Sequence, residues 1–211
     1  GIFVEFGAWD GLYLSNTRWL YEKGWDGVLI EKNKKKFNRL NSLYDNTNTF
    51  CINALVGCSE DDCLRAIIGD DLNVDSINFV SIDVDGMDLD IFQAMGFKPD
   101  VVVLEGGFSF SPFLKDSVPN SVAHLNLQQP LYQIEKVAKK MGYSLICFYQ
   151  DSYLVREDHS NKFPSFDIVS LYEDGFNFMP DQFRDWLIDF RGKHKKIKAI
   201  ESKYFKKFNP N

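Results

Sequence analysis

Residues 2–11 read IFVEFGAWDG, and this stretch carries the first indication of the fold. The apolar residues 2–6 predict a short buried strand. Gly7 and Gly11 allow a tight turn after it, in which the backbone can approach a ligand closely. The loop matches neither the G-x-G-x-x-G dinucleotide fingerprint nor the G-x-x-x-x-G-K phosphate loop. Its acids, Glu5 and Asp10, suit a cationic ligand better than a phosphate.

Outward from this loop, strand-like and helix-like segments alternate. A helix over residues 131–141 precedes two paired strands, and we expect these last two strands at 143–149 and 153–155. Five βα units followed by a hairpin predict an α/β fold: a Rossmann-like, doubly wound, mainly parallel seven-stranded sheet with a C-terminal antiparallel hairpin. Further strands are expected at 2–6, 28–30, 49–56, 77–82 and 101–104, and further helices at 16–23, 34–43, 60–68, 89–95 and around 183–190.

The charge is unevenly distributed along the chain. The 211 residues include 24 Lys and Arg and 30 Asp and Glu, a net charge of -6. From Arg191 onward, eight basic residues face one acid, so this tail carries +7 and the body -13. An acidic body argues against nucleic-acid binding. The tail is either a solvated helix face or a contact for an anionic partner.

No apolar run approaches the roughly 20 residues that span a bilayer, so no membrane span is expected. The four cysteines, Cys51, Cys58, Cys63 and Cys147, form no C-x-x-C pair. Buried, reduced thiols in a cytoplasmic compartment are expected from this pattern. The first residues already form a strand, so a native N-terminal segment could be missing.

Ligands of doubly wound sheets bind at the carboxyl ends of the strands, so the residues after each strand are the candidates. Glu31 follows the second strand about 20 residues beyond the glycine loop, where an acid can accept both hydroxyls of a ribose. It could instead be a carboxylate facing water. Asn53 and Ala54 follow the third strand. The Asn53 amide could meet an adenine edge or cap the end of the strand.

Carboxylates crowd the ends of the fourth and fifth strands. Asp83, Asp85 and Asp88 follow the fourth strand, and Glu105 follows the fifth. Close carboxylates repel one another, so a cation, a proton or a positive ligand should compensate. Asp83, Asp85 and Glu105 are therefore candidates for divalent metal ligands or a general base. Helix capping accounts for Asp88.

Residues 106–126 are irregular and rich in Ser, Phe, Pro and Asn, and a loop this long is usually functional or disordered. His124 within it is a second candidate base, although an isolated loop histidine is commonly just exposed. Phe108, Phe110 and Phe113 could form a lid, a wall for the acceptor or a satellite core cluster.

Six segments in this order resemble the FkbM-type family of class I S-adenosylmethionine-dependent methyltransferases. They are residues 4–11 with 15–17, 24–31, 53–57, 81–86, 99–105, and 140–145 with 154–156. The resemblance covers residues 2–158 and implies a methyltransferase domain over residues 1–158. Residues 159–211 lie outside the resemblance, and we expect them to form a mostly helical extension with a basic tail. It departs at Glu105-Gly-Gly107, where relatives often read Glu-Tyr-Asn, so a polar residue that could orient the acceptor is absent.

The resemblance implies S-adenosylmethionine as cofactor and oxygen methylation of a sugar or another small metabolite. It implies that the 5–11 loop lines the methionine part and that Glu31 holds the ribose. The cofactor-binding residues expected are Glu5, Gly7, Ala8, Asp10, Gly11, Ser15, Asn16, Glu31, Lys32, Asn53, Ala54 and Asp83.

Methyl transfer requires alignment of donor and acceptor and removal of the acceptor proton. The expected catalytic residues are Asp83, Asp85, Glu105 and His124. Two rival functions remain open. A catalytically silent cofactor-binding or scaffold domain would share the same sheet. A nicotinamide-dependent oxidoreductase would need a loop that accepts a pyrophosphate, which the acidic first loop does not resemble. The sequence leaves the oligomeric state undetermined.

Overall fold

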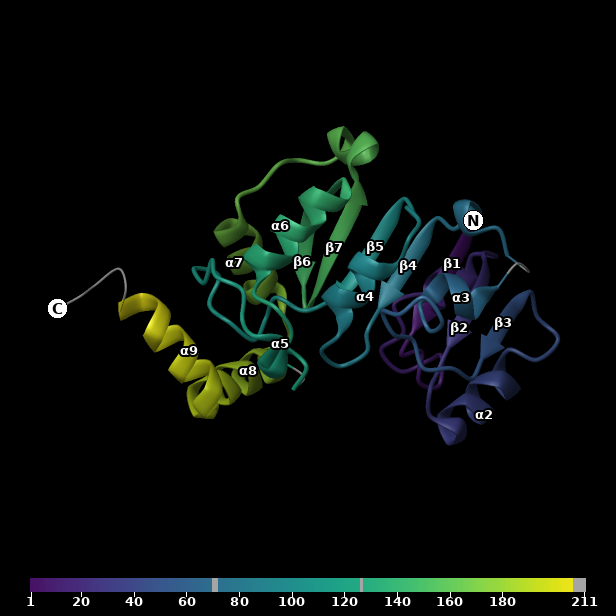
Figure 1. Ribbon diagram of the computed structural model, residues 1–211, viewed down its shortest axis with the longest axis horizontal. Helices are drawn as coiled ribbons and strands as arrows, with labels where there is room; N and C mark the ends of the chain where they lie inside the picture. The colour runs from purple at the N-terminus through teal and green to yellow at the C-terminus, as the bar shows by residue number, and fades with distance from the viewer. Residues whose placement is uncertain (70–71, 126, 207–211) are drawn as a thin grey trace. The chain divides into compact units, whose positions relative to one another are not determined.

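The structure, a computed structural model, describes residues 1–69, 72–125 and 127–206 (Figure 1). Seven strands form one sheet in the order β3-β2-β1-β4-β5-β7-β6. The pairs from β3 to β5 are parallel and the β6–β7 pair is antiparallel, which confirms the predicted α/β, Rossmann-like class. The strands are β1 (Ile2–Phe6), β2 (Asp26–Ile30), β3 (Thr49–Ile52), β4 (Phe79–Ile82), β5 (Val101–Glu105), β6 (Tyr143–Tyr149) and β7 (Asp151–Arg156).

Helices fill most of the connections between these strands. Those in the first half of the chain are α1 (Arg18–Glu22), α2 (Lys34–Leu43), α3 (Leu64–Ile68) and α4 (Asp88–Ala94), with a 3-10 turn at Val74–Ser76. The second half contains α5 (Asn120–Ala123), α6 (Leu131–Met141), α7 (Ile168–Phe178), α8 (Asp181–Lys193) and α9 (Lys195–Lys206), with a 3-10 turn at Glu157–Lys162. None of the helices in the described ranges has the length and apolar character needed to cross a bilayer.

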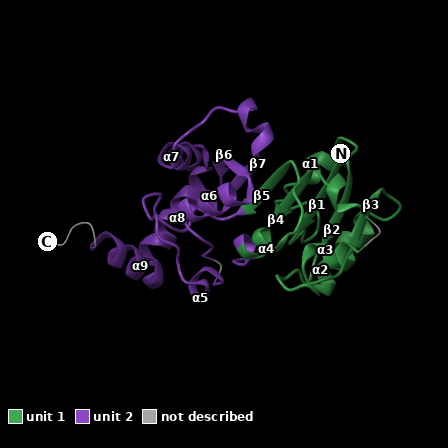
Figure 2. Cartoon of the chain, turned by 45° about the horizontal axis from the view of Figure 1, so that its top comes forward, with its two compact units in different colours: residues 1–84, 90–104 green, residues 85–89, 105–211 purple. Residues whose placement is uncertain are grey.

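The chain divides into two compact units (Figure 2). Unit 1 contains residues 1–84 and 90–104, and unit 2 contains residues 85–89 and 105–211. The division therefore falls at the end of β5, whereas the sequence placed a boundary after residue 158. The methyltransferase domain expected over residues 1–158 includes parts of both units, so its role as one functional domain stays a prediction.

Unit 1 is built on the parallel strands, whose apolar side chains are buried. Phe3, Leu29, Leu40 and Tyr44 form a core cluster with Ala8. Near-continuous apolar runs of this kind are typical of parallel strands that are covered on both faces. The glycine loop thus begins on a rigid, buried strand.

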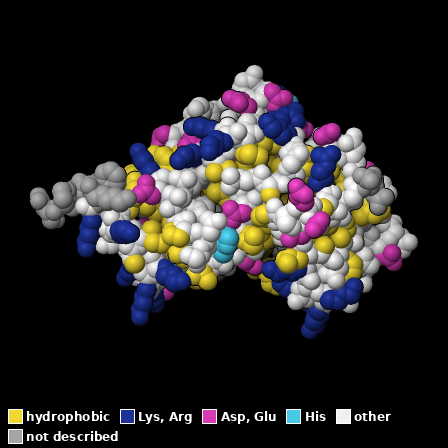
Figure 3. Space-filling view, viewed as in Figure 1, with side chains coloured by type: hydrophobic (Ala, Val, Ile, Leu, Met, Phe, Trp, Pro, Cys, Tyr) yellow, Lys and Arg dark blue, Asp and Glu magenta, His cyan; other side chains and the backbone are white. Residues whose placement is uncertain are grey.

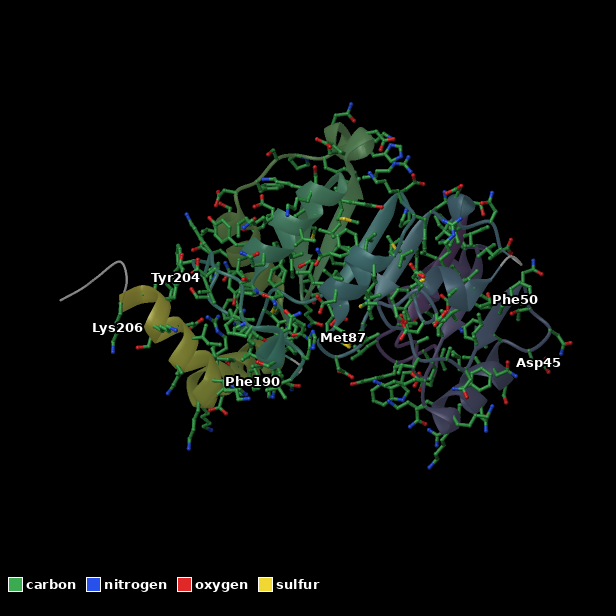
Figure 4. The ribbon with its side chains drawn as sticks, in the orientation of Figure 1. Asp45, Phe50, Met87, Phe190, Tyr204 and Lys206 are labelled. Atoms are coloured by element: carbon green, nitrogen blue, oxygen red, sulfur yellow. The ribbon has the colours of Figure 1, made fainter. Side chains whose placement is uncertain are left out.

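Unit 2 is held by aromatic packing. Phe108 lies in a cluster with Phe148 and Tyr172, whose rings stack at 5.3 Å between centroids. Phe110 is fully buried in a second cluster, in which Phe190 of α8 and Tyr204 of α9 also take part (Figure 4). Two of the three phenylalanines of the irregular loop therefore belong to satellite core clusters, one of the three interpretations left open by the sequence.

Phe113, the third of these phenylalanines, is 54% exposed. The irregular stretch also contains the short helix α5. Its residue 126, like Lys207 in the basic tail, lies outside the described residues.

The strand expected over 77–82 begins only at Phe79. Three other expected elements are shorter in the structure because side chains bind the backbone locally. The strand expected over 49–56 ends at Ile52, since the Asn53 amide donates to the Glu31 carbonyl. The helix expected over 16–23 is Arg18–Glu22, and the Asn16 backbone N–H instead donates to Glu5. The helix expected over 60–68 is Leu64–Ile68, because residues 59–62 form a turn around the Asp62 carboxylate.

The cysteines are free, as expected, but their predicted burial is wrong. Cys58 and Cys147 are exposed, and Cys51 and Cys63 are partly buried. Cys147 lies in β6 at a position that faces away from the buried side chains of the strand. The apolar residues around it suggested burial, but alternate residues of a strand face opposite sides.

Candidate functional site

The ends of four parallel strands are level in unit 1. Ile52 of β3 pairs with Ile30 of β2, Ile30 with Phe6 of β1, and Phe6 with Ile82 of β4. The next residue on each strand is Asn53, Glu31, Gly7 and Asp83, in that spatial order. The sheet order changes direction around β1, with β2 on one side and β4 on the other. This is the position at which open α/β sheets bind ligands.

Gly7 is required by its contact with the next strand end. Its φ is +77°, and a Cβ at this position would lie 1.7 Å from the Asp83 carbonyl oxygen. The Asp83 backbone N–H in turn donates to the Phe6 carbonyl at 3.2 Å. The glycine therefore lets the first loop and the end of β4 meet at the switch point.

Glu31 joins the first loop to the turn before α2. One carboxylate oxygen accepts a hydrogen bond from the Trp9 backbone N–H at 3.0 Å, and the other accepts from the Asn33 N–H at 2.6 Å. The side chain is buried, with only 5% of the residue exposed. Each carboxylate oxygen retains a second lone pair, so the group can still accept hydroxyl donors.

The Glu5 carboxylate faces residues 15–17 of the chain and not an open ligand site. Its carboxylate accepts from the Ser15 and Thr17 hydroxyls at 2.7 and 2.6 Å, and from the Asn16 backbone N–H at 3.0 Å. Burial raises the pKa of Glu5, while these hydrogen bonds act in the opposite direction. Glu5, Ser15 and Asn16, all predicted to bind the cofactor, thus bind one another, and they fix the chain between the loop and α1.

The remaining cofactor candidates occupy the same edge of unit 1. The Asp10 carboxylate accepts from the Tyr13 and Leu12 backbone N–H groups, and these bonds, that to Tyr13 foremost, lower the pKa of Asp10. The Asn53 amide donates to the carbonyls of Glu31 and Lys32, at 2.7 and 3.1 Å. Asn53 therefore stabilises the β2–α2 turn, and only its side-chain oxygen remains for an adenine edge. Ala8 and Gly11 are buried in the loop, and Ala54 is half-buried.

Three of the four catalytic candidates belong to unit 2. Carboxylate oxygens of Asp85 and Glu105 lie within 4.8 Å of each other. Asp85 has a φ of +65°, which is uncommon for a residue other than glycine, and it is exposed. His124 is also exposed, and its Cα would lie 2.9 Å from a Cβ placed on Gly86. The structure thus brings the backbone of His124 to the turn that carries Asp85.

Asp83, the fourth candidate, is the last but one residue of the first segment of unit 1, two residues before Asp85. Neighbouring carboxylates can hold a hard cation through oxygen, and a single carboxylate can act as a general base. The expected metal site of Asp83, Asp85 and Glu105 stays a prediction.

The departure at Gly107 has a steric explanation. Its φ is +98°, and a Cβ there would lie 2.8 Å from Leu131 and 3.1 Å from Phe148. Both neighbours belong to the core of unit 2. A side chain at this position would displace them, so an acceptor-orienting residue cannot simply be added at Gly107.

Two polar residues of the site were missed by the sequence analysis. Thr17 is buried and binds Glu5, and Ser81 is fully buried in β4, where its hydroxyl accepts from the Asn16 amide at 3.1 Å. A single serine in the apolar run FVSI was the available signal, since a buried hydroxyl requires a partner.

Comparisons with known proteins find similarity among solved structures. No protein-family description and no curated protein sequence matches it. Among solved structures, it is similar to WbdD in complex with the kinase inhibitor LY294002, with 14% identity and a TM-score of 0.47 over 74% of this chain and 36% of that one. It is similar to an S-adenosylmethionine dependent methyltransferase from Mesorhizobium loti, with 16% identity and a TM-score of 0.34 over 55% of this chain and 51% of the other.

A third similar structure is a Staphylococcus aureus protein provisionally named a caffeoyl-CoA O-methyltransferase, with 12% identity, a TM-score of 0.44 and coverage of 72% and 74%. This chain thus spans about a third of WbdD and about half of the Mesorhizobium loti protein. None of the three similarities assigns it to a family.

Proposed function

We propose that this protein is an S-adenosylmethionine-dependent methyltransferase that methylates an oxygen atom of a sugar or another small metabolite. The observation that carries the proposal is the row of strand ends in unit 1. Two acids, Glu31 and Asp83, flank the glycine turn at Gly7, at the switch point of a parallel sheet. A ribose and a positively charged centre need acids at such an edge. The six segments resembling FkbM-type methyltransferases support the same cofactor.

Each residue of the proposed cofactor site has a defined task. Glu31 would accept the ribose hydroxyls with the lone pairs that Trp9 and Asn33 leave unused. The loop at Gly7 and Ala8 would line the methionine part, on a backbone that the Asp83 contact holds in place. Glu5 acts as a positioning residue, because its carboxylate accepts hydrogen bonds from residues 15–17.

S-adenosylmethionine, when bound, supplies a methyl carbon that is displaced from sulfur by the acceptor oxygen. The chain must take up the proton that the acceptor hydroxyl releases. Asp85 and Glu105 are candidates for this, since a carboxylate can accept a proton from a hydroxyl that it contacts and their oxygens lie within 4.8 Å of each other. His124, beside the Gly86 turn, is the second candidate base. Asp83 is the third, or it serves with Asp85 and Glu105 as a metal ligand.

Isothermal titration with S-adenosylhomocysteine tests the proposal directly. We expect saturable binding to the full chain, and no comparable binding of NAD⁺, because the first loop lacks the pyrophosphate fingerprint. A turnover assay with a panel of sugar and small-molecule hydroxyl acceptors follows. Absence of heat at millimolar S-adenosylhomocysteine, in protein shown by circular dichroism to be folded, would overturn the proposal. Binding without turnover on any acceptor would instead favour the silent scaffold.

A further inference from the structure

Large apolar side chains are exposed in the loop after β1. Four of its six residues from 9 to 14 are of this kind: Trp9 at 44%, Leu12 at 52%, Tyr13 at 64% and Leu14 at 72%. Contiguous exposed apolar side chains on a protein surface are typical of interaction sites. The Trp9 and Tyr13 rings contact each other edge to face, with 6.0 Å between centroids.

The backbone of this loop is fixed, which distinguishes it from a flexible surface segment. The Trp9 N–H is bound by Glu31, and the Gly11 carbonyl accepts from the Tyr44 hydroxyl at 2.9 Å. Trp9 has a φ of +48°, a conformation that few residues other than glycine adopt. Such conformations persist where surrounding contacts impose them, and they concentrate at functional sites.

A basic segment lies beside the Trp9 ring. Residues 32–39 contain five positive charges and no acid, in a chain whose residues before Arg191 carry a net charge of -13. The Lys36 ammonium is 4.0 Å from the centroid of the Trp9 ring. On the face seen in Figure 3, individual Lys and Arg side chains project from the region of α2, with hydrophobic side chains beside them. We call this group the Trp9 surface: Trp9, Tyr13, Lys32, Lys34, Lys35 and Lys36.

The lysines of the Trp9 surface have no ion-pair partner among the residues that the structure describes. Lys32, Lys34 and Lys35 are exposed, and Lys36 is half-buried. The Lys36 ammonium lies over the Trp9 ring and the Lys34 ammonium over the Phe37 ring, so the two do not share one partner. The positive potential of the segment would nevertheless attract an anionic ligand. Residues 31–39 carry five positive charges and one acid, Glu31, so the segment keeps a positive excess.

We propose that the Trp9 surface binds a phosphorylated sugar as the methyl acceptor, its ring on Trp9 and Tyr13 and its phosphate at Lys36, in the positive potential of the neighbouring lysines. This rests on the proposed function, since the surface adjoins Glu31 at the proposed cofactor edge. Aromatic faces bind rings, and ammonium groups bind phosphate as point charges. A neutral sugar would leave the lysines without a partner. The phosphate can belong to a sugar phosphate or to a nucleotide-linked sugar.

Tryptophan fluorescence and calorimetry of the full chain test this with four probes: glucose 6-phosphate, UDP-glucose, methyl glucoside and inorganic pyrophosphate. We expect one or both phosphorylated sugars to bind, with an affinity that falls as salt is raised, and methyl glucoside to bind at least tenfold more weakly. UDP-glucose binding with no glucose 6-phosphate binding would identify the nucleotide-linked source, and the reverse would identify the sugar phosphate. Pyrophosphate binding as tightly as either sugar would overturn the role of the aromatic rings.

Two variants and a matched control separate the parts of the surface. The triple substitution Lys34→Gln, Lys35→Gln, Lys36→Gln should weaken binding of the phosphorylated probe about tenfold. Trp9→Ala should weaken it similarly without changing its salt dependence. The control is Lys23→Gln. The Lys23 ammonium lies 5.0 Å from the centroid of the exposed Trp19 ring, so it forms the same kind of lysine–tryptophan contact away from the strand ends. Lys23→Gln should leave the affinity unchanged.

The outcome also distinguishes this inference from the proposed function. S-adenosylhomocysteine binding combined with equal, or absent, binding of phosphorylated and neutral sugars overturns the inference alone. An equal loss of affinity for the phosphorylated probe in the triple lysine variant and in Lys23→Gln overturns the inference as well. Absence of S-adenosylhomocysteine binding overturns the proposed function, whatever the sugars do.

Discussion

The Glu31 carboxylate and the Trp9 backbone N–H, 22 positions apart, are joined by a 3.0 Å hydrogen bond. This bond connects the end of β2 to the loop after β1. It places the proposed ribose acceptor and the exposed Trp9 ring on one rigid assembly, together with the start of α2. Affinity for a cofactor and order in the first loop should therefore depend on the same carboxylate.

Replacing Glu31 by Gln tests that dependence. The amide has one acceptor oxygen in place of two, so its NH2 group would face the N–H of either Trp9 or Asn33. We expect a loss of about 1–3 kcal/mol in the free energy of unfolding. Binding of S-adenosylhomocysteine should weaken about tenfold or more. Urea denaturation and calorimetry measure the two effects.

Glu22→Gln is the control for this experiment. Glu22 pairs with Arg18 on the surface of α1, and its side chain is 53% exposed. Removal of that charge should change stability by about 0.5 kcal/mol or less. Equal behaviour of the two variants would show that the Glu31 contacts contribute nothing specific.

Gly7→Ala should be among the most destabilising single substitutions in unit 1. A left-handed backbone costs an alanine about 1–2 kcal/mol, and the added Cβ would also overlap the Asp83 carbonyl oxygen. We expect a total loss above about 3 kcal/mol, or failure to fold. Gly24→Ala is the matched control, because Gly24 has a similar φ of +82° with no atom within 4 Å of the added Cβ. Similar losses in the free energy of unfolding of the two variants, measured by urea denaturation, would contradict the close approach of β1 and β4 at their ends.

The strand ends were predictable because an apolar run that stops at a polar residue marks both the strand and its last position. Ile30 followed by Glu31, and Ile82 followed by Asp83, are of this kind. Parallel pairing then places such residues at one edge. What the sequence could not specify is the partner of each carboxylate. Glu5 and Glu31 look alike in sequence, yet Glu5 binds residues 15–17 and Glu31 binds the first loop.

The second half of the chain was less predictable. Phe183, Trp186 and Phe190 indicated one helix by their spacing, and their rings do form a stack along α8. The helix α7 and the turn between α8 and α9 carried no comparable signal. Cys147 illustrates the same limit, since an apolar composition does not show which face of an edge strand remains open to water.

The pH dependence of stability should report on Glu5. Burial raises its pKa in the folded state above the ordinary value of 4.5, so the folded protein binds this proton more tightly than the unfolded chain does. The contribution of Glu5 to stability is therefore greatest at acid pH. It falls as the pH rises from about 4.5 through the folded-state pKa.

Glu5→Gln removes that titration and isolates it from other groups. The wild-type protein should lose stability relative to Glu5→Gln as the pH is raised above about 4.5, and the difference should level off above the folded-state pKa. Urea denaturation of both proteins between pH 4 and pH 8 measures the difference. A difference that stays constant over this range would show that the Glu5 pKa is the same in the folded and unfolded chains.

The attachment of α9 to unit 2 should depend on Glu201. Its carboxylate accepts from the Ser111 backbone N–H at 2.6 Å and from the Arg191 guanidinium at 3.2 Å, and Arg191 also donates to the Tyr172 hydroxyl at 2.7 Å. Both members of the ion pair are largely buried, with 21% of the Glu201 side chain exposed. Glu201→Ala leaves the Ser111 N–H without its acceptor and Arg191 without its counter-charge, while alanine favours the helix itself.

We therefore expect amide hydrogen exchange over residues 195–206 to accelerate about fivefold or more in Glu201→Ala, since about 1–3 kcal/mol of contacts is lost. Asp189→Ala is the matched control, because Asp189 pairs with Lys193 on the exposed face of α8, where both side chains are more than half exposed. Exchange in α9 should be unaffected by that change. Equal exchange in the two variants would mean that the apolar contacts of Ile197 and Tyr204 alone keep α9 packed on unit 2, and that Glu201 does not contribute.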